Sequence, residues 1–234
     1  MSWDFPLSTS LATSPSVTTP ATFSFWAWVK FAQSGSVAKT IILDAGGRIE
    51  LIATLGSTFD DLQLTRSGMT GSIVCDMSAN GVTANNQWVF VGVAMSGFTT
   101  LDRFVLATET TPAFAATVTN TLSGTGFTAA AVKYLGNSNA SDRRLDGLIH
   151  SAGFHTASLS LAEFETARTT FDQSASASWT FLLNDTAAPW SVTAQSGSGD
   201  LTATDVTHDA DAPSFGGGPV PAVKRRRSLL GVGR

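Results

Sequence analysis

One segment of the sequence alternates between two kinds of position over ten residues, and this pattern restricts the fold more than any other feature. From Thr22 to Phe31 every second residue is apolar, beginning with Phe23, and the intervening positions include Trp26 and Trp28. Strict alternation is typical of a β-strand, whose side chains point to opposite faces of the sheet. Because both faces of this strand carry large apolar groups, we expect both to be covered, as in the inner region of a β-sandwich.

Further strand patterns follow at short intervals, separated by turn-rich pieces that contain Gly, Ser or Asn. The predicted strands are Ile41–Leu43, Arg48–Leu55, Asp61–Thr65, Ile73–Met77, Gln87–Met95, Arg103–Thr108, Val132–Gly136, Asp146–His155, Trp179–Leu183 and Leu201–Asp205. Residues 8–21, rich in Ser, Thr and Pro, are expected to form an extended loop. Many short strands with regular turn signals predict a β-sandwich or a jelly roll.

A single segment has the pattern of a helix, and it begins after Ser160. Ser160 and Glu163 have the spacing of a capping box, in which each side chain satisfies a free backbone N–H of the other residue. The apolar residues expected on one face are Leu161, Phe164, Ala167 and Phe171. Acidic side chains in the first turn and Arg168 near the last turn complement the helix dipole.

The charge of the chain is divided between a body and a short tail. The formal net charge is −4, from 14 basic and 18 acidic residues, but residues 213–234 hold five basic residues and no acidic ones. The other 9 basic and 18 acidic residues give residues 1–212 a net charge of −9. We therefore expect one domain over residues 1–212, followed over residues 213–234 by a Gly/Pro linker and a flexible basic arm.

Several classes of protein are excluded by what the sequence lacks. Cys75 is the single cysteine, so we expect neither an intramolecular disulfide nor a cysteine-based zinc site. The sequence has no apolar run near ~18 residues, and residues 1–6 do not have the pattern of a secretory signal peptide. The negative body would repel phosphates, so we do not expect it to bind duplex DNA.

Three pieces of sequence occur in an order found in a known family. They are Phe23–Lys30, then Gln87–Met95, and then Tyr134–Asn137 with Leu145–Ile149 and the helix that follows. Together they resemble the laminin-G-like branch of the concanavalin A-like lectin/glucanase superfamily over roughly residues 20–172. The resemblance implies an all-β, two-sheet antiparallel jelly-roll sandwich. The residues that it places in the core are Phe23, Phe25, Trp28, Trp88 and Ile149.

The resemblance raises the question of glycoside hydrolysis, since the superfamily includes glucanases. Those enzymes need two carboxylates flanking the scissile bond, and the glucanases carry an E-x-D-x-x-E strand that this chain lacks. Asp60 and Asp61 are adjacent, so their side chains would point to opposite faces of a strand. Glu163 and Glu165 are explained by helix capping and the helix dipole. We therefore expect no catalytic residues and no enzymatic activity.

The three histidines, His150, His155 and His208, do not form a recognisable catalytic or metal site. There is no Gly-x-Ser-x-Gly nucleophile elbow to accompany a histidine base. In a regular strand His150 and His155 would face opposite sides, because five residues separate them, and they could not share a metal ion. We expect no resident metal, and local hydrogen bonding for each histidine.

Ligand binding is the remaining chemistry, and the best candidate loop follows the predicted strand at residues 132–136. Asn137, Asn139 and Asp142 offer oxygen atoms of the kind that calcium prefers, although the same residue types also form ordinary polar turns. Sugar binding would need an exposed aromatic ring beside polar groups, and Trp26 and Trp190 are the candidates. The alternative for both tryptophans is packing in the core.

The tail combines charge with two leucines. The residues expected to form a partner-docking arm are Lys224, Arg225, Arg226, Arg227, Leu229 and Leu230. A solvated run of charges is the common interpretation of such a cluster, but exposed leucines gain nothing from a free tail. We therefore predict an arm that docks on an adjacent subunit.

These expectations combine into one leading function and two alternatives. The leading interpretation is a non-catalytic virion structural protein, either a capsid decoration or a tail-associated module, that is made in the host cytoplasm and is extracellular after release. Its partners would be other virion subunits, as a homo-oligomer or attached to a capsid or tail protein, and a host-surface glycan; no cofactor is required. The alternatives are a glycoside hydrolase or carbohydrate-binding module, and a bacterial surface adhesin. A gene position beside capsid or tail genes would favour the first.

Overall fold

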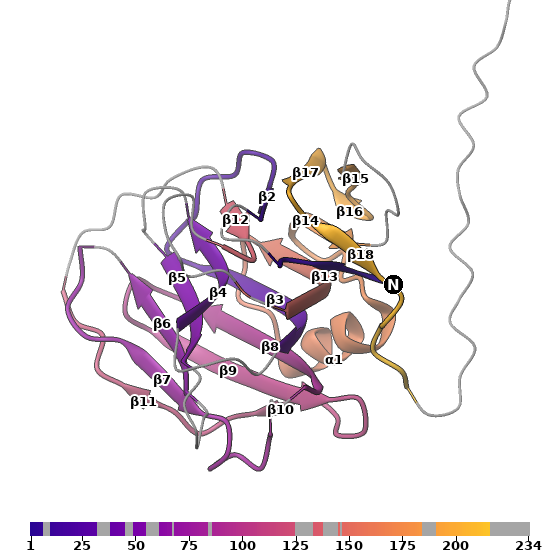
Figure 1. Cartoon of the computed structure of the whole chain (residues 1–234). Coiled ribbons are helices and arrows are strands. Elements are labelled where there is room, and N and C mark those ends of the chain that lie inside the picture. Colours follow the sequence, from indigo (N-terminus) through magenta and orange to yellow (C-terminus); the bar gives the residue numbers. More distant parts are fainter. Residues whose placement is uncertain are drawn as a thin grey trace, which may run out of the picture.

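The computed structural model describes residues 1–6, 10–31, 38–44, 49–54, 61–66, 68–83, 86–124, 133–137, 145, 147–183 and 191–215. Within these residues the strands form two antiparallel sheets packed face to face, and helix α1 lies against the outer face of one of them (Figure 1). The predicted all-β jelly-roll sandwich with one short helix is thereby confirmed. No helix in this described part is long and apolar enough to cross a membrane.

Sheet A is the sheet that carries the helix. In spatial order its main path is β10 (Phe114–Ala115), β9 (Leu101–Thr108), β8 (Trp88–Met95), β3 (Phe23–Phe31), β13 (Gly147–His155), β1 (Ser2–Asp4) and β18 (Thr207–Asp209). Strand β14 (Ala177–Leu182) pairs with the second half of β13, and β16 (Ser196–Gly197) pairs with β14. The N-terminal strand β1 therefore lies between β13 and the late strand β18 (Figure 1).

Sheet B forms the other half of the sandwich. Its order is β11 (Thr119–Asn120), β7 (Ile73–Asp76), β6 (Asp61–Arg66), β5 (Ile49–Thr54), β4 (Ala38–Asp44), β12 (Lys133–Leu135), β2 (Leu11–Thr13), β17 (Asp200–Thr204) and β15 (Ser191–Thr193). Consecutive strands β4 to β7 pair as hairpins, whereas β12, β2 and β17 come from distant parts of the chain. One side of sheet B is therefore built from strands adjacent in sequence, and the other side joins segments that are far apart in the chain.

Each of the predicted strands is present in the structure, with boundaries that differ by a few residues at some ends. The prediction of an extended loop over residues 8–21 was wrong in part, because β2 occupies Leu11–Thr13. The other strands that the sequence analysis missed are β1, β10, β11, β15, β16 and β18. Each of these has only two or three residues, too few for a periodic pattern to be read.

The space between the sheets contains the main hydrophobic core, and β3 shows how the sequence builds it. Phe23, Phe25 and Val29 face the space between the sheets, whereas Trp26 and Trp28 face the other way, into a second cluster under the helix. All five are at most 2% exposed, which confirms that both faces of β3 are covered. The five core residues implied by the family resemblance are all buried.

Helix α1 (Leu161–Thr170) begins with the predicted capping box. Ser160 accepts a hydrogen bond from the Glu163 backbone N–H, and the Glu163 side chain accepts one from the Ser160 backbone. Phe164 and Ala167 are buried against sheet A, but Leu161 is 38% exposed, so its expected place on the buried face was wrong. Leu161 comes six residues before Ala167. At 100° per residue, these six steps leave the two side chains roughly 120° apart around the helix axis.

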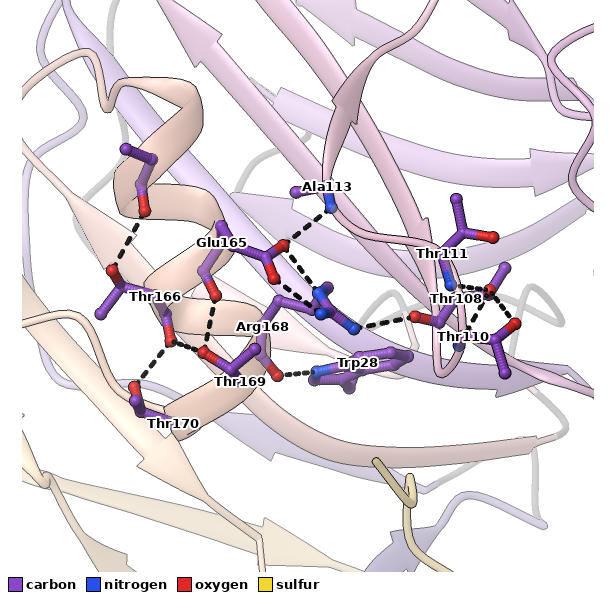
Figure 2. Close-up of polar contacts among 11 residues, drawn as sticks. Trp28, Thr108, Thr110, Thr111, Ala113, Glu165, Thr166, Arg168, Thr169 and Thr170 are labelled. Carbon is purple, nitrogen blue, oxygen red and sulfur yellow. Dashed lines mark hydrogen bonds and ion pairs between the residues drawn. The ribbon is translucent and has the colours of Figure 1, made fainter. Parts of the chain in front are cut away.

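A polar network fastens the helix to the sheet (Figure 2). The guanidinium of Arg168 forms two hydrogen bonds to Glu165, at 2.7 and 2.6 Å, and a third to the backbone oxygen of Thr108 at 3.1 Å. The indole N–H of Trp28 donates to the backbone oxygen of Arg168 at 2.9 Å. These contacts cover the middle of the outer face of sheet A, whereas no helix among the described residues covers the outer face of sheet B.

The last described residues return to the helix side of the molecule. Asp211 forms an ion pair with Lys30 and accepts a hydrogen bond from the indole of Trp88 at 3.2 Å. The ring of Phe215 lies 5.6 Å from that of Trp28 and 5.5 Å from that of Phe171. Residues 213–215 therefore pack on the body, although the sequence pattern placed the boundary with the arm after residue 212.

Candidate functional site

The predicted ligand loop is only partly among the described residues. Asn137 lies at its start and is 1% exposed, whereas Asn139, Asp142 and Trp190 lie outside the described residues. The two ends of the loop are held together, because the backbone N–H of Leu145 donates to the oxygen of Gly136 at 2.6 Å. The loop therefore leaves and re-enters the sandwich at one point, at the end of β12.

Trp26 does not provide the exposed ring that a sugar would need, so this prediction was wrong. Its side chain is fully buried, its ring is stacked with Phe90 at 5.9 Å, and its indole N–H donates to Nε2 of His155 at 3.0 Å. Trp26 is buried because helix α1 covers the face of sheet A toward which its side chain points, and this contact depends on the tertiary structure.

The two histidines of β13 lie on the same face of the strand, contrary to the expectation from their spacing. The pairing of β13 with β3 shifts register between Ile149 and Ser151, and this bulge lets His150 face the same side as His155. His150 contacts the ring of Phe171 at 4.4 Å, whereas His155 contacts Trp26 at the other end of the strand.

Burial makes both histidines unsuitable as bases. It lowers the pKa of His150 to about 3, with a smaller contribution from the N-terminal amine, and it also lowers the pKa of His155. Nδ1 of His155 lies 3.0 Å from the backbone oxygen of Ala175, so this histidine is held within the fold. Among the described residues, no group of three His, Cys, Asp or Glu side chains is placed to hold a metal ion.

The structure does bring two carboxylates together in a way that the sequence pattern did not reveal. Asp61 on β6 is the direct cross-strand partner of Asp76 on β7, and both side chains are exposed. Hydrogen bonds from the Ala79 backbone and the Ser78 hydroxyl lower the pKa of Asp76. A glycosidase needs one carboxyl with a raised pKa as its general acid, and Asp76 has the opposite property.

The outer face of sheet B carries a row of hydroxyl-bearing residues that crosses four strands. Ser191 pairs with Thr202, Thr202 pairs with Thr13, and Thr13 pairs with Tyr134. Neighbouring residues along these strands point into the sandwich and are buried, so this row points outward. The buried neighbours are Val192, Leu201, Ala12 and Leu135.

Tyr134 is the aromatic member of this row, and it is the single tyrosine of the chain. Tyr134 is half-buried, so part of this residue remains accessible beside Thr13. At about 4.8 Å between neighbouring strands, the row extends over roughly 15 Å. Three residues later, at Asn137, the chain enters the predicted ligand loop, so the row and the loop adjoin.

Tyr134 was not singled out from the sequence. Its place in the row depends on how the strands that contain residues 13, 134, 191 and 202 pair with one another. A local sequence pattern does not reveal such pairing. The sequence did offer one signal, the alternation of Lys133, Tyr134 and Leu135. It places the side chain of Tyr134 on the other face of the strand from the buried side chain of Leu135. An aromatic ring beside aligned hydroxyl groups can stack on an apolar face of a ligand and hydrogen-bond its polar edge.

Comparison with known proteins identifies the fold. Residues 8–165 match the family model of the concanavalin A-like lectin/glucanases superfamily. A provisionally assigned carbohydrate binding protein from Bacteroides ovatus aligns with a TM-score of 0.61 and 12% identity, over 91% of this chain and 60% of that chain. A heptameric SAP-like pentraxin from Limulus polyphemus aligns with a TM-score of 0.51 and 11% identity, over 71% of this chain and 80% of that chain. No curated protein sequence matches the chain.

Proposed function

We propose that this chain, which belongs to the concanavalin A-like lectin/glucanases superfamily, is a non-catalytic structural protein of a virion whose jelly roll binds host glycans. The observation that supports glycan binding most directly is the outward row formed by Ser191, Thr202, Thr13 and Tyr134. The carbohydrate-binding assignment of the Bacteroides ovatus protein agrees with this proposal at the level of the fold. Because one fold hosts many functions, glycan binding is inferred from the residues of this row and not from the fold alone.

The chemistry of the row suits an uncharged sugar. A pyranose ring has hydroxyl groups at its edge and C–H groups on its faces, so it needs both hydrogen-bond partners and an apolar contact. Thr13 and Thr202 supply hydroxyl groups that both donate and accept, and the Tyr134 ring supplies the apolar contact. The β-strands hold these groups in fixed positions, which reduces the entropy lost on binding.

The absence of catalysis is supported by the state of the exposed acid pair. Asp61 and Asp76 face each other across β6 and β7, but Asp76 is stabilised as a carboxylate by its hydrogen bonds. Asp76 therefore does not suit the role of the protonated general acid that glycoside hydrolysis requires. We expect that a bound oligosaccharide remains intact when incubated with the protein, and release of new reducing ends at enzymatic rates would contradict this part of the proposal.

Replacing Tyr134 by alanine should abolish most glycan binding. We expect affinity for the glycans bound by the wild-type protein to fall at least about tenfold, which corresponds to ~1.4 kcal/mol, because the aromatic contact is lost. The measurement is a glycan array followed by titration of each glycan that binds. Val74→Ala is the matched control, since Val74 is also half-buried on the outer face of sheet B but lies on β7. Equal losses in the two variants would contradict the assignment of the row.

The virion role predicts that residues 216–234 serve in assembly. Their four contiguous basic residues would meet the negative body of a neighbouring subunit, and Leu229 and Leu230 would add apolar contact. A chain that ends at Phe215 keeps the contacts of Phe215 with the body, so it should fold normally. We expect weaker self-association in sedimentation experiments, with a dependence on salt that disappears on truncation. Unchanged assembly would contradict the docking arm.

A further inference from the structure

The loop between β8 and β9 displays an aromatic ring to solvent at the end of the sandwich opposite the predicted ligand loop. Among the described residues the exposed large apolar side chains are Met1, Phe98 and Leu161. Phe98 is the aromatic one and is 40% exposed. The loop follows Met95, which pairs with Phe23 at the start of β3, whereas Gly147 pairs with Phe31 at its end. The length of β3 therefore separates the two places by about 25 Å.

A buried arginine, Arg66, is hydrogen-bonded to the backbone of this loop. The guanidinium of Arg66 donates from Nη1 to the backbone oxygens of Gly97, at 3.1 Å, and Phe98, at 2.6 Å. Its carbon Cζ lies 5.6 Å from the centroid of the Phe98 ring and 5.2 Å from that of Phe23. Arg66 is 2% exposed, so its charge has been removed from water to hold this loop. Burying a charge is costly unless it is hydrogen-bonded, and the two hydrogen bonds that this guanidinium donates to the loop backbone hold Gly97 and Phe98 in place.

The surroundings of Phe98 are polar. The Asn120 side chain donates to the backbone oxygen of Thr99 at 3.4 Å and retains a second N–H, since an amide has two donors. Ser96 donates to Asp102 at 2.5 Å. Partial burial acts to raise the pKa of that carboxyl, but hydrogen bonds from Ser158 and Ser96 outweigh it and lower the pKa. Ser96, Asp102 and Asn120 are all exposed. A single ring within a polar rim differs from the wider apolar patch typical of a protein-docking surface.

We propose that Phe98 is a second sugar-binding platform, which stacks on the C–H face of a neutral pyranose while the rim formed by Asn120 and Ser96 hydrogen-bonds its hydroxyl groups. The negative face of an aromatic ring attracts the slightly positive C–H groups of such a face. The ionised Asp102 in the rim disfavours anionic sugars. The loop is already held by Arg66, so little ordering is needed on binding. The inference rests on the proposed glycan-binding function, and it adds a site at the other end of the molecule.

The test uses the full chain with ¹³C-labelled phenylalanine rings and three probes: methyl β-D-glucopyranoside, methyl β-D-galactopyranoside and methyl N-acetyl-β-D-glucosaminide. We expect at least one glycoside to shift the Phe98 ring resonance, which is identified by its loss in Phe98→Ala. Phe98→Ala should weaken binding at this site by about fivefold or more, as expected for one lost aromatic stack, and Phe98→Trp should retain it. Leu161→Ala is the matched control, because Leu161 is an exposed apolar side chain on α1.

The outcomes separate this site from the row on sheet B. The wild-type titration does not depend on the folding of any variant, and a Phe98 resonance unmoved by all three glycosides would overturn the platform. So would equal affinity in Phe98→Ala and the wild-type protein. If Tyr134→Ala removes array binding while the Phe98 resonance stays still, the proposed function stands and the Phe98 platform falls. If the Phe98 resonance shifts and Tyr134→Ala binds normally, the platform stands and the assignment of the row falls.

Discussion

Replacing Gly136 by alanine should destabilise the protein by about 3 kcal/mol, and urea unfolding followed by tryptophan fluorescence will measure the change. Gly136 has φ +79°, a conformation that L-residues adopt at a cost of ~1–2 kcal/mol. A Cβ at this position would also overlap the buried ring of Phe5. Relieving that overlap moves core atoms, which typically costs ~1–3 kcal/mol. Gly136 stands between Tyr134 and the predicted ligand loop, so this variant should also weaken glycan binding.

Gly81→Ala separates the two contributions to this effect. Gly81 has nearly the same backbone angle, φ +75°, but no atom lies within 4 Å of the place that a Cβ would occupy. We expect Gly81→Ala to lose about 1 kcal/mol of stability, and this loss comes only from the unfavourable backbone conformation. The excess in Gly136→Ala then measures the contact with Phe5. If the two variants lost equal stability, the close approach of Phe5 would not be the cause.

Acidification from pH 7 to pH 5 should remove about 2 kcal/mol of stability through His150 alone. Burial and the N-terminal amine lower the pKa of His150 in the folded protein to about 3, whereas the unfolded chain binds a proton near pH 6.5. The unfolded state therefore binds more protons throughout this range, and stability falls as the pH decreases. His155 acts in the same direction, because burial also lowers its pKa.

The measurement is the free energy of unfolding in urea at half-unit steps from pH 7 to pH 5. In this range the carboxylates with lowered pKa values, such as Glu163 and Asp211, remain ionised in both states and contribute little. His150→Leu keeps an apolar contact with Phe171 and removes the titrating group. Its stability should fall less steeply with acid than that of the wild-type protein. Parallel curves for the two proteins would show that His150 is not the source.

Short-range patterns predicted much of the secondary structure. The alternation in β3 was read correctly because the period of a strand depends only on the backbone. The capping box of α1 was read correctly for a similar reason, since Ser160 and Glu163 bond to each other's backbone. Strands β1, β2 and β18 were missed, because three residues contain no period and their pairing partners lie far away in the chain.

The candidate sites depended much more on tertiary structure. The sequence places Trp26 in a strand and Phe98 in a turn between strands, but it does not show which of the two rings the rest of the fold covers. Trp26 lies under α1 and is buried, whereas Phe98 lies on a loop held outward by Arg66. The hydroxyl row could not be predicted either, because it requires the register of four strands that are not consecutive.

The sequence by itself determined that this chain folds as an antiparallel sandwich with one capped helix, and it placed most strands along the chain. These features follow from side-chain periodicity and from hydrogen bonds between residues close in sequence. Only the tertiary structure decided which face stays open and which aromatic rings remain accessible. It also decided that His150 and His155 share one face. The physical reason is that one bulge, or one helix packed over a sheet, changes the environment of side chains whose local sequence stays the same.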